Sequence, residues 1–308
     1  MVQLAGLRHL VLVDTKPPVS FFAYPGKESY LVPDGCDVHE LAAPDGDALG
    51  SLEALRDALR AGLGARAVMG TRAGTGTGTP TLQKPVGRRS PSGKLTAEKV
   101  CAAVASVLPE GAIVSDEAQT SGLTFAAATA GAPRHDVLAL TGGAIGQGLP
   151  VAVGAAIACP DRPVLALEAD GSALYTIQSL WTMAREGLDV TVLVFNNRSY
   201  GILNVELARV GAKAAGPRAK SQLDLSRPNV DFVEIARGLG VPAVRIDSAE
   251  RLVTELRRAL AEPGPHVVEA VIPTVFSERQ LRVMPHALRA LTALPRPLAA
   301  AVKRRLYP

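Results

Sequence analysis

The chain has 308 residues, of which 47% are hydrophobic and 20% are charged, and it carries a formal net charge of +4. This composition is typical of a folded globular protein with room for one large domain or two modest ones. The basic residues are scattered rather than clustered with aromatic residues, so we expect no nucleic-acid partner. The longest apolar stretch, near residues 149–159, is shorter than the roughly 20 residues that cross a bilayer, so we expect no membrane partner.

Three cysteines, Cys36, Cys101 and Cys159, are widely spaced and form no CxxC motif. An odd number of cysteines with this spacing favours reduced thiols in a cytoplasmic protein over a disulfide framework or a zinc site. The five histidines show no ligand spacing and no nearby nucleophile, so we interpret them as surface or core residues.

The first part of the chain predicts a small α/β unit over residues 1–69. HLVLVD, residues 9–14, is interpreted as a buried strand that ends at Asp14, and residues 48–63 have apolar residues at helical spacing. Residues 70–94 are rich in Gly, Thr, Pro and Arg and have no apolar period. We interpret them as a linker between domains.

From residue 95 onward, helices and short apolar runs alternate regularly. The runs are continuous rather than alternating, which indicates strands buried on both faces of a parallel sheet. The predicted fold of residues 95–275 is therefore α/β, a doubly wound parallel sheet with six strands. The expected strands are 112–116, 137–140, 164–170, 190–197, 243–247 and 266–272, and the expected helices are 95–108, 118–130, 146–159, 173–186, 231–239 and 249–261. Residues 276–308 are interpreted as a C-terminal tail, either a basic amphipathic helix on a membrane surface or a solvated or partner-packed helix.

Two neighbouring strands end in polar residues, which directs attention to one edge of the sheet. Asp170 ends one strand and Asn196-Asn197 end the next, and parallel strands bring these ends to the same crevice. Gly171 allows a ligand close to the backbone, and Ser172 opens a helix whose free N–H groups suit phosphate. Oxygen ligands from Asp, Asn and a carbonyl fit Mg²⁺ or Ca²⁺, so a metal-bridged diphosphate is expected. The simpler alternatives are a helix cap at Asp170 and ordinary turn chemistry at Asn196-Asn197.

Residues 167–201, LEADGSALYTIQSLWTMAREGLDVTVLVFNNRSYG, resemble the thiamine diphosphate signature, in which GDG is followed after roughly 25–30 residues by NN. Ala169 stands in place of the first glycine of that signature. A second segment, TGGAIGQGLPVAVGAA at 141–156, resembles the one that cradles the cofactor in acetolactate synthases and benzoylformate decarboxylase. The chain as a whole resembles the C-terminal half of acetolactate synthase large subunits, with a partial middle domain followed by the diphosphate-binding domain.

The resemblance implies a set of site residues. Mg²⁺ would be held by Asp170, Asn197 and the carbonyl of Ser199. Ile145 would be the apolar prop that bends the cofactor, and the backbone of Gly143, beside Ala144, would meet its aminopyrimidine. The diphosphate would be held by Gln119, Thr120, Gly171, Ser172, Tyr200, Gly201 and Ile202.

The implied function is a thiamine diphosphate- and Mg²⁺-dependent carboligase or decarboxylase of 2-oxo acids. Its transferase form belongs to branched-chain amino acid biosynthesis. In this family a glutamate from a pyrimidine-binding domain of a neighbouring subunit activates the cofactor. We expect that domain to be missing here, so no catalytic residue is predicted in this chain, and a homo- or hetero-oligomer with such a domain is predicted instead.

Three other interpretations stay open from the sequence. The chain could be a noncatalytic cofactor-binding or regulatory subunit, or a lyase of the benzoylformate decarboxylase type. An unrelated nucleotide-binding domain would need a GxGxxG after a strand and an acidic ribose ligand, a pattern that GGAIGQG fits poorly. Strand alternation is expected to turn Glu168 away from Asp170, so a paired-carboxylate site is not expected.

Overall fold

The computed structural model describes residues 4, 6–20, 28–67, 89–210, 216–274 and 283. The chain divides into two compact units, Met1–Leu82 and Gln83–Pro308, which are described separately. Most of the expected linker at 70–94, and all of the expected tail at 276–308 except residue 283, lie outside the described residues. The domain bounds expected from the sequence therefore stay predictions.

The first unit contains a small parallel sheet and a long helix. Strands β1 (His9–Val13) and β2 (Asp37–Ala42) pair in parallel, and α1 (Ala48–Ala67) follows. The prediction of a buried strand at residues 9–14 was wrong, because Leu12 is buried whereas Val11 is 52% exposed. The physical reason is that, among the described residues, this sheet has only two strands and little to cover its faces.

The second unit is built on a six-stranded parallel sheet with the order β4-β3-β5-β6-β8-β7. The predicted α/β doubly wound sheet is confirmed, with each expected strand within three residues of its observed bounds. The strands are β3 (Ala112–Glu117), β4 (His135–Ala139), β5 (Val164–Ala169), β6 (Val190–Asn196), β7 (Ala243–Ile246) and β8 (His266–Val271).

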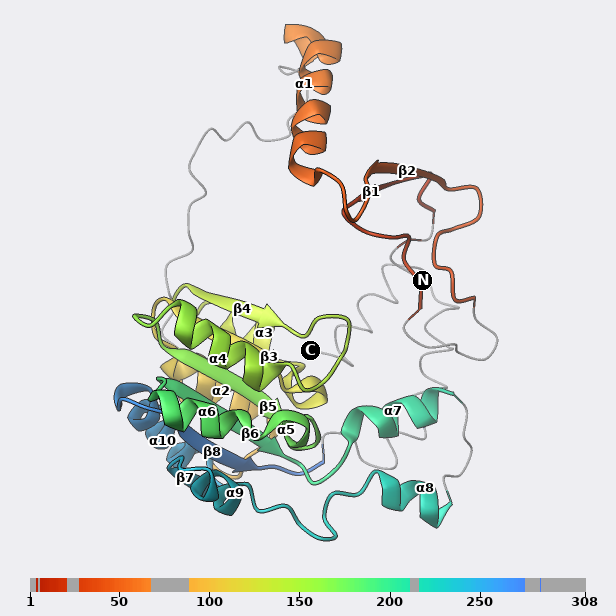
Figure 1. Ribbon diagram of the computed structural model, residues 1–308. Coiled ribbons are helices and arrows are strands. Elements are labelled where there is room, and N and C mark those ends of the chain that lie inside the picture. Colours follow the sequence, from red (N-terminus) through yellow and green to blue (C-terminus); the bar gives the residue numbers. More distant parts are fainter. Residues whose placement is uncertain are drawn as a thin grey trace. The chain divides into compact units, whose positions relative to one another are not determined.

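Helices cover both faces of this sheet (Figure 1). On β5, Leu165 and Leu167 pack into one hydrophobic cluster and Val164 and Ala166 into the other. This alternation explains why the strands are apolar at every position. One face carries α2 (Ala97–Val107), α3 (Phe125–Thr129) and α10 (Ala249–Ala261), and the other carries α4 (Gly148–Ala158), α6 (Ser179–Glu186) and α9 (Phe232–Gly238).

The structure corrects the sequence-based expectation at several elements. The helix expected at 118–130 is a 3₁₀ turn, η1 (Gln119–Gly122), followed by the short α3, and Gln119 has a left-handed φ of 52°. The helix expected at 173–186 begins three residues earlier as α5 (Asp170–Thr176) and is interrupted before α6. Strand β4 is not buried on both faces, since it lies at the sheet edge with Val137 45% exposed. Helices α7 (Gly201–Arg209) and α8 (Pro217–Gln222) had not been predicted.

The chain order places a topological switch point between β3 and β5. After β3 the chain adds β4 on one side, and it then returns to add β5 on the other side. In open α/β sheets, ligands bind in the crevice at the carboxyl ends of the strands where the order reverses. This crevice lies beside the ends of β3, β5 and β6, which is where Asp170 and Asn197 were expected.

Candidate functional site

Buried oxygen atoms without a hydrogen-bond partner gather at the switch point, and they include Oε1 of Glu168 and one oxygen each of Asp170 and Asn197. Asp170, 2% exposed, follows β5 and opens α5, while Asn197, 4% exposed, follows β6. Oδ1 of Asp170 accepts the N–H of Gly171 at 2.9 Å, but Oδ2 of Asp170 and Oδ1 of Asn197 are unpartnered. Burying such groups without a partner is costly, so the pair has the character of a cation site.

Burial raises the pKa of the Asp170 carboxyl to about 6, while the backbone N–H groups of Gly171 and of residues 197–199 oppose that rise. The amides of the turn after β6 therefore lie near the carboxylate without making a hydrogen bond that satisfies its Oδ2 atom. Near pH 7 the group is mostly an anion inside the protein, which is the state that binds a metal ion.

The turn after β6 is fixed by its own backbone and by a later loop. Arg198 has a left-handed φ of 57°, and its carbonyl accepts the N–H of Leu225 at 3.0 Å. The N–H of Tyr200 donates to the carbonyl of Leu223 at 3.0 Å, and the carbonyl of Ser199 accepts the N–H of Gly201 at 2.8 Å. The Ser199 carbonyl keeps a second lone pair, so it still has the capacity to bind a metal.

The 3₁₀ turn after β3 lies against the turn after β6. Nδ2 of Asn197 donates to Oγ of Ser121 at 3.3 Å, which leaves its unpartnered Oδ1 free for a cation. A Cβ atom on Gly201 would lie 2.9 Å from Oγ1 of Thr120. Thr120 therefore lies against the first residue of α7 (Gly201–Arg209). Gln119 in η1 and Ile202 in α7 are half-buried and have no described side-chain contact to Asp170.

The ring of Tyr200 approaches Gly171 closely. A Cβ atom at position 171 would lie 2.4 Å from Cε1 of the tyrosine ring, which covers the start of α5. The Oγ atom of Ser172, the next residue, lies 3.1 Å from the carbonyl of Ala169 and 3.3 Å from that of Glu117. The Ser172 hydroxyl is thus engaged within the protein, and its backbone N–H, in the first turn of α5, has no partner within the helix.

The glycine-rich turn between β4 and α4 forms the other side of the crevice. Gly143 and Ala144 are exposed and Ile145 is half-buried, with Gly143 in the left-handed region at φ 71°. Oγ1 of Thr176 on α5 donates to the carbonyl of Gly146 at 2.9 Å, so this turn is attached to the helix that Asp170 opens. The described contacts do not join Ile145 to the metal residues.

A pair of buried glutamates was missed by the sequence analysis. Glu117 and Glu168 are register partners on β3 and β5, and each is 1% exposed. Glu117 accepts the N–H groups of Gly146 and Gly148. Burial and the neighbouring Glu117 charge raise the pKa of Glu168 well above its usual range. The sequence analysis considered Glu168 only beside Asp170, whereas the structure places Glu168 next to Glu117 on the neighbouring strand. The sequence signal that could have predicted this pair is that both apolar runs, AIVSDE at 112–117 and LALEAD at 165–170, contain a glutamate near their ends.

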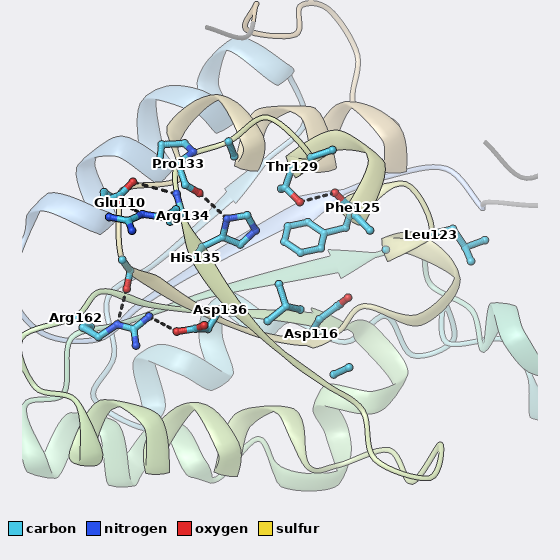
Figure 2. A pocket seen from close by; sticks show the side chains of 17 residues that line it. Glu110, Asp116, Leu123, Phe125, Thr129, Pro133, Arg134, His135, Asp136 and Arg162 are labelled. Atoms are coloured by element: carbon cyan, nitrogen blue, oxygen red, sulfur yellow. Dashed lines mark hydrogen bonds and ion pairs between the residues drawn. The ribbon is translucent and has the colours of Figure 1, made fainter. Parts of the chain in front are cut away.

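A wide groove of about 1040 Å³ lies elsewhere, along edge strand β4. Figure 2 shows Phe125 and His135 within it, and ion pairs join Glu110 to Arg134 and Asp136 to Arg162. None of the expected cofactor or metal residues lines this groove. Two ion pairs thus occupy four of the charged side chains that line the groove.

The candidate metal ligands at the switch point are all oxygen atoms, which suit Mg²⁺ rather than a metal that prefers histidine or cysteine ligands. Within the described part of the chain, no group of three or more His, Cys, Asp or Glu residues is placed to hold a metal. Mg²⁺ typically takes one or two carboxylates and completes its shell with phosphate and water, which matches one carboxylate, one amide and one carbonyl. The described helices include none that is long and apolar enough to span a membrane.

A family model with the description "Thiamine pyrophosphate enzyme, C-terminal TPP binding domain" matches residues 116–270, half of the chain. The chain belongs to the thiamine pyrophosphate enzymes. The matched residues run from the end of β3 to β8 and so contain every element of the switch-point site. The predicted resemblance to this family is confirmed.

Relatives of this thiamine pyrophosphate enzyme carry two kinds of name. A Mycobacterium tuberculosis protein named as a putative acetolactate synthase large subunit, IlvX, is 52% identical over 89% of this chain and 50% of its own length. Benzoylformate decarboxylase of Pseudomonas aeruginosa is 32% identical over 80% of this chain and 44% of its own length. The chain thus spans about half the length of these relatives.

Solved structures agree with this assignment. A thiamine diphosphate-dependent 4-hydroxybenzoylformate decarboxylase of Rhodococcus jostii superposes with a TM-score of 0.63 at 25% identity, covering 90% of this chain and 50% of that one. Benzoylformate decarboxylase of Polynucleobacter necessarius, at 20% identity, shares the fold with a TM-score of 0.62 and covers 88% of this chain and 50% of that one.

Proposed function

We propose that the chain is the diphosphate-binding half of a thiamine diphosphate- and Mg²⁺-dependent 2-oxo acid carboligase or decarboxylase of the acetolactate synthase type. The observation that carries this proposal is the pair of unpartnered, buried oxygens on Asp170 and Asn197 at the switch point. At the carboxyl ends of β5 and β6 these two oxygens would hold the metal, and the start of α5 would offer backbone N–H groups to the diphosphate.

In this proposal the chain's residues bind and orient the cofactor. Asp170, Asn197 and the Ser199 carbonyl hold Mg²⁺. When bound, thiamine diphosphate supplies the electron sink for making or breaking the bond beside the 2-oxo group. The diphosphate is held by Gln119, Thr120, Gly171, Ser172, Tyr200, Gly201 and Ile202, and the ring half by Gly143, Ala144 and Ile145.

We further propose that the activating glutamate lies outside these 308 residues, in a pyrimidine-binding domain that completes the site in a homo- or hetero-oligomer. The support is that relatives named as whole enzymes are about twice as long as the part this chain matches. We place the enzyme in the cytoplasm, where the three free cysteines stay reduced.

A lyase of the benzoylformate decarboxylase type is the second candidate. The specific support is that Pseudomonas benzoylformate decarboxylase aligns over 80% of this chain, and that the Rhodococcus jostii 4-hydroxybenzoylformate decarboxylase superposes on 90% of it. The two candidates differ in the fate of the fragment that remains after loss of CO₂. A carboligase joins this fragment to a second 2-oxo acid, and a lyase releases it as an aldehyde.

The test incubates the purified chain with thiamine diphosphate, Mg²⁺ and either pyruvate or benzoylformate, and measures released CO₂ and the organic product. We expect no turnover by the chain alone, and turnover after addition of the purified N-terminal half of a relative that carries the pyrimidine domain. Acetolactate from pyruvate supports the carboligase, and benzaldehyde from benzoylformate supports the lyase. Turnover by the chain alone contradicts the need for a partner, and its absence with every added half, despite cofactor binding, favours a noncatalytic subunit.

A further inference from the structure

The last residue of β3, Glu117, makes hydrogen bonds to the turn between β4 and α4. Both carboxylate oxygens of Glu117 are used, because Oε1 accepts the N–H of Gly146 and Oε2 accepts the N–H of Gly148. Glu117 is 1% exposed and is the last residue of β3, on the rigid part of the sheet beside the switch point. A buried carboxylate with two N–H donors is a strong, directional anchor.

Two hydroxyl groups complete this anchoring of the same short segment. Oγ of Ser115, two residues before Glu117 on β3, donates to the carbonyl of Gly148 at 2.8 Å. Oγ1 of Thr176 donates to the carbonyl of Gly146 at 2.9 Å. The N–H and C=O groups of both glycines are therefore bound by side chains from β3 and α5, and Glu117 supplies the only charge among these contacts.

The usual cap of α4 does not explain these contacts. Gln147, the residue before the helix, makes no side-chain cap. Instead, its Oε1 atom accepts the N–H of Thr141 at 3.1 Å and its Nε2 atom donates to the carbonyl of Ala139 at 3.3 Å. These two hydrogen bonds join the end of the turn to its beginning. The first N–H groups of α4 are free for Glu117, whose negative charge also suits the positive end of the helix.

The packing at Gly148 leaves no room for a side chain at this position. A Cβ atom at position 148 would lie 2.7 Å from Oε2 of Glu117 and 2.1 Å from Oε1 of Glu168. The two carboxyl groups thus abut the backbone of the turn directly. A side chain on β3 fixes the position of a turn that lies more than twenty residues further along the chain.

We propose that Glu117 is a positioning residue that holds the 141–148 turn in the shape needed by the ring half of thiamine diphosphate. The inference rests on the proposed function, because that function places the ring half against Gly143, Ala144 and Ile145. Glu117 does not touch the metal residues in the described contacts. It acts on ring recognition through Gly146 and Gly148, while Asp170 and Asn197 act on the diphosphate.

The first experiment needs no cofactor. Amide resonances of Gly146 and Gly148 are measured by NMR in the wild-type chain, in Glu117→Gln and in Glu168→Gln. A glutamine at 117 has one acceptor oxygen and an NH₂ group, so at least one of the two amides loses its carboxylate partner, moves upfield and exchanges faster with solvent. Glu168→Gln is the comparison variant, because Glu168 is equally buried and abuts Gly148 without accepting a hydrogen bond from either amide. Unchanged Gly146 and Gly148 amides in Glu117→Gln overturn the proposal.

The second experiment separates the ring half from the diphosphate half. Calorimetry compares Mg²⁺-inorganic diphosphate with Mg²⁺-thiamine diphosphate on the same three chains. We expect Glu117→Gln to weaken thiamine diphosphate binding about tenfold or more, the effect of losing a hydrogen bond to a charged group, with little change for inorganic diphosphate. Glu168→Gln should change neither affinity selectively.

Each other result counts against the inference in a distinct way. Equal weakening of both ligands by Glu117→Gln contradicts selective positioning of the ring half, and retained inorganic diphosphate binding shows that the variant is folded. A wild-type chain that binds thiamine diphosphate no better than inorganic diphosphate also overturns it. A wild-type chain that binds neither ligand contradicts the proposed function instead, while the NMR result still reports whether Glu117 holds the turn.

Discussion

Nδ2 of Asn196 donates to Oε1 of Glu269 across 2.6 Å in the core of the sheet. Glu269 is fully buried on β8, and its other oxygen accepts Nε of Arg245 at 2.7 Å. Oδ1 of Asn196 accepts the N–H of Arg198 at 3.1 Å. The first asparagine of the Asn196-Asn197 pair therefore ties the turn to the sheet, and the second presents its oxygen to the site.

This relationship predicts a large effect on stability for a residue remote from the ligand. Glu269→Ala should lower the free energy of unfolding by about 2–3 kcal/mol, because it leaves the amide of Asn196 unpaired in the core. Denaturant titration measures the change. Glu234→Ala, which breaks the exposed pair with Arg237, is the control and should cost under about 1 kcal/mol. Similar costs for the two variants would show that the buried bond is not special.

The buried charge of Asp170 predicts a pH-dependent stability in metal-free protein. Its pKa is raised to about 6 by burial, so the folded chain carries a penalty above that pH that is absent below the ordinary value near 3.8. Asp170→Asn should therefore raise the free energy of unfolding at pH 7 by up to about 3 kcal/mol, and this gain should vanish toward pH 4.

The measurement is denaturant unfolding of both chains in a chelating buffer between pH 4 and 7.5. Excess Mg²⁺ and inorganic diphosphate provide the control condition, in which the bound metal compensates the carboxylate and the advantage of the variant disappears. A stability difference that does not depend on pH would contradict the assignment of this pKa to Asp170.

We expect replacement by alanine to lower the free energy of unfolding by different amounts at Gly148 and Gly171. Gly148→Ala places a methyl group against two buried carboxylates on the sheet, whereas Gly171→Ala meets the half-buried ring of Tyr200 at the end of a side chain. We expect a loss of about 3 kcal/mol for Gly148→Ala and about 1 kcal/mol for Gly171→Ala.

Adding Tyr200→Ala to each variant supplies the control for this comparison. Removal of the ring should relieve the strain at position 171 and leave the cost at position 148 unchanged. A double variant Gly171→Ala/Tyr200→Ala that behaves as the sum of its single changes would show that the ring does not limit the space at Gly171.

The sheet could be predicted from the sequence because both of its faces are covered. Successive residues such as Val164 and Leu165 pack into the two hydrophobic clusters on opposite faces of the sheet. Every position is therefore apolar, and this produces the continuous runs that indicate parallel strands. Strand β1 and edge strand β4 also contain short apolar runs like those of the central strands. The same pattern therefore predicted that both strands are buried, and this prediction was wrong. Strand patterns report side-chain character but not the layers that cover a strand.

The positions of Asp170 and Asn197 could be predicted because each follows its strand directly. Glu117 could not be assigned a role, because its partners Gly146 and Gly148 lie about thirty residues away and meet it only through the fold. Helix 118–130 was predicted as continuous because its apolar spacing suggests one helix, whereas the left-handed Gln119 and the 3₁₀ turn break it at the site.

The central claim is tested most directly by calorimetric titration of thiamine diphosphate into the purified chain with and without Mg²⁺. The wild-type chain should bind the cofactor only with Mg²⁺, and Asp170→Ala should abolish that binding. Asp116→Asn, a change at a half-buried carboxyl that lines the β4 groove, is the control and should bind as the wild type does. Equal binding with and without Mg²⁺, or full Mg²⁺-dependent binding by Asp170→Ala, would contradict the account.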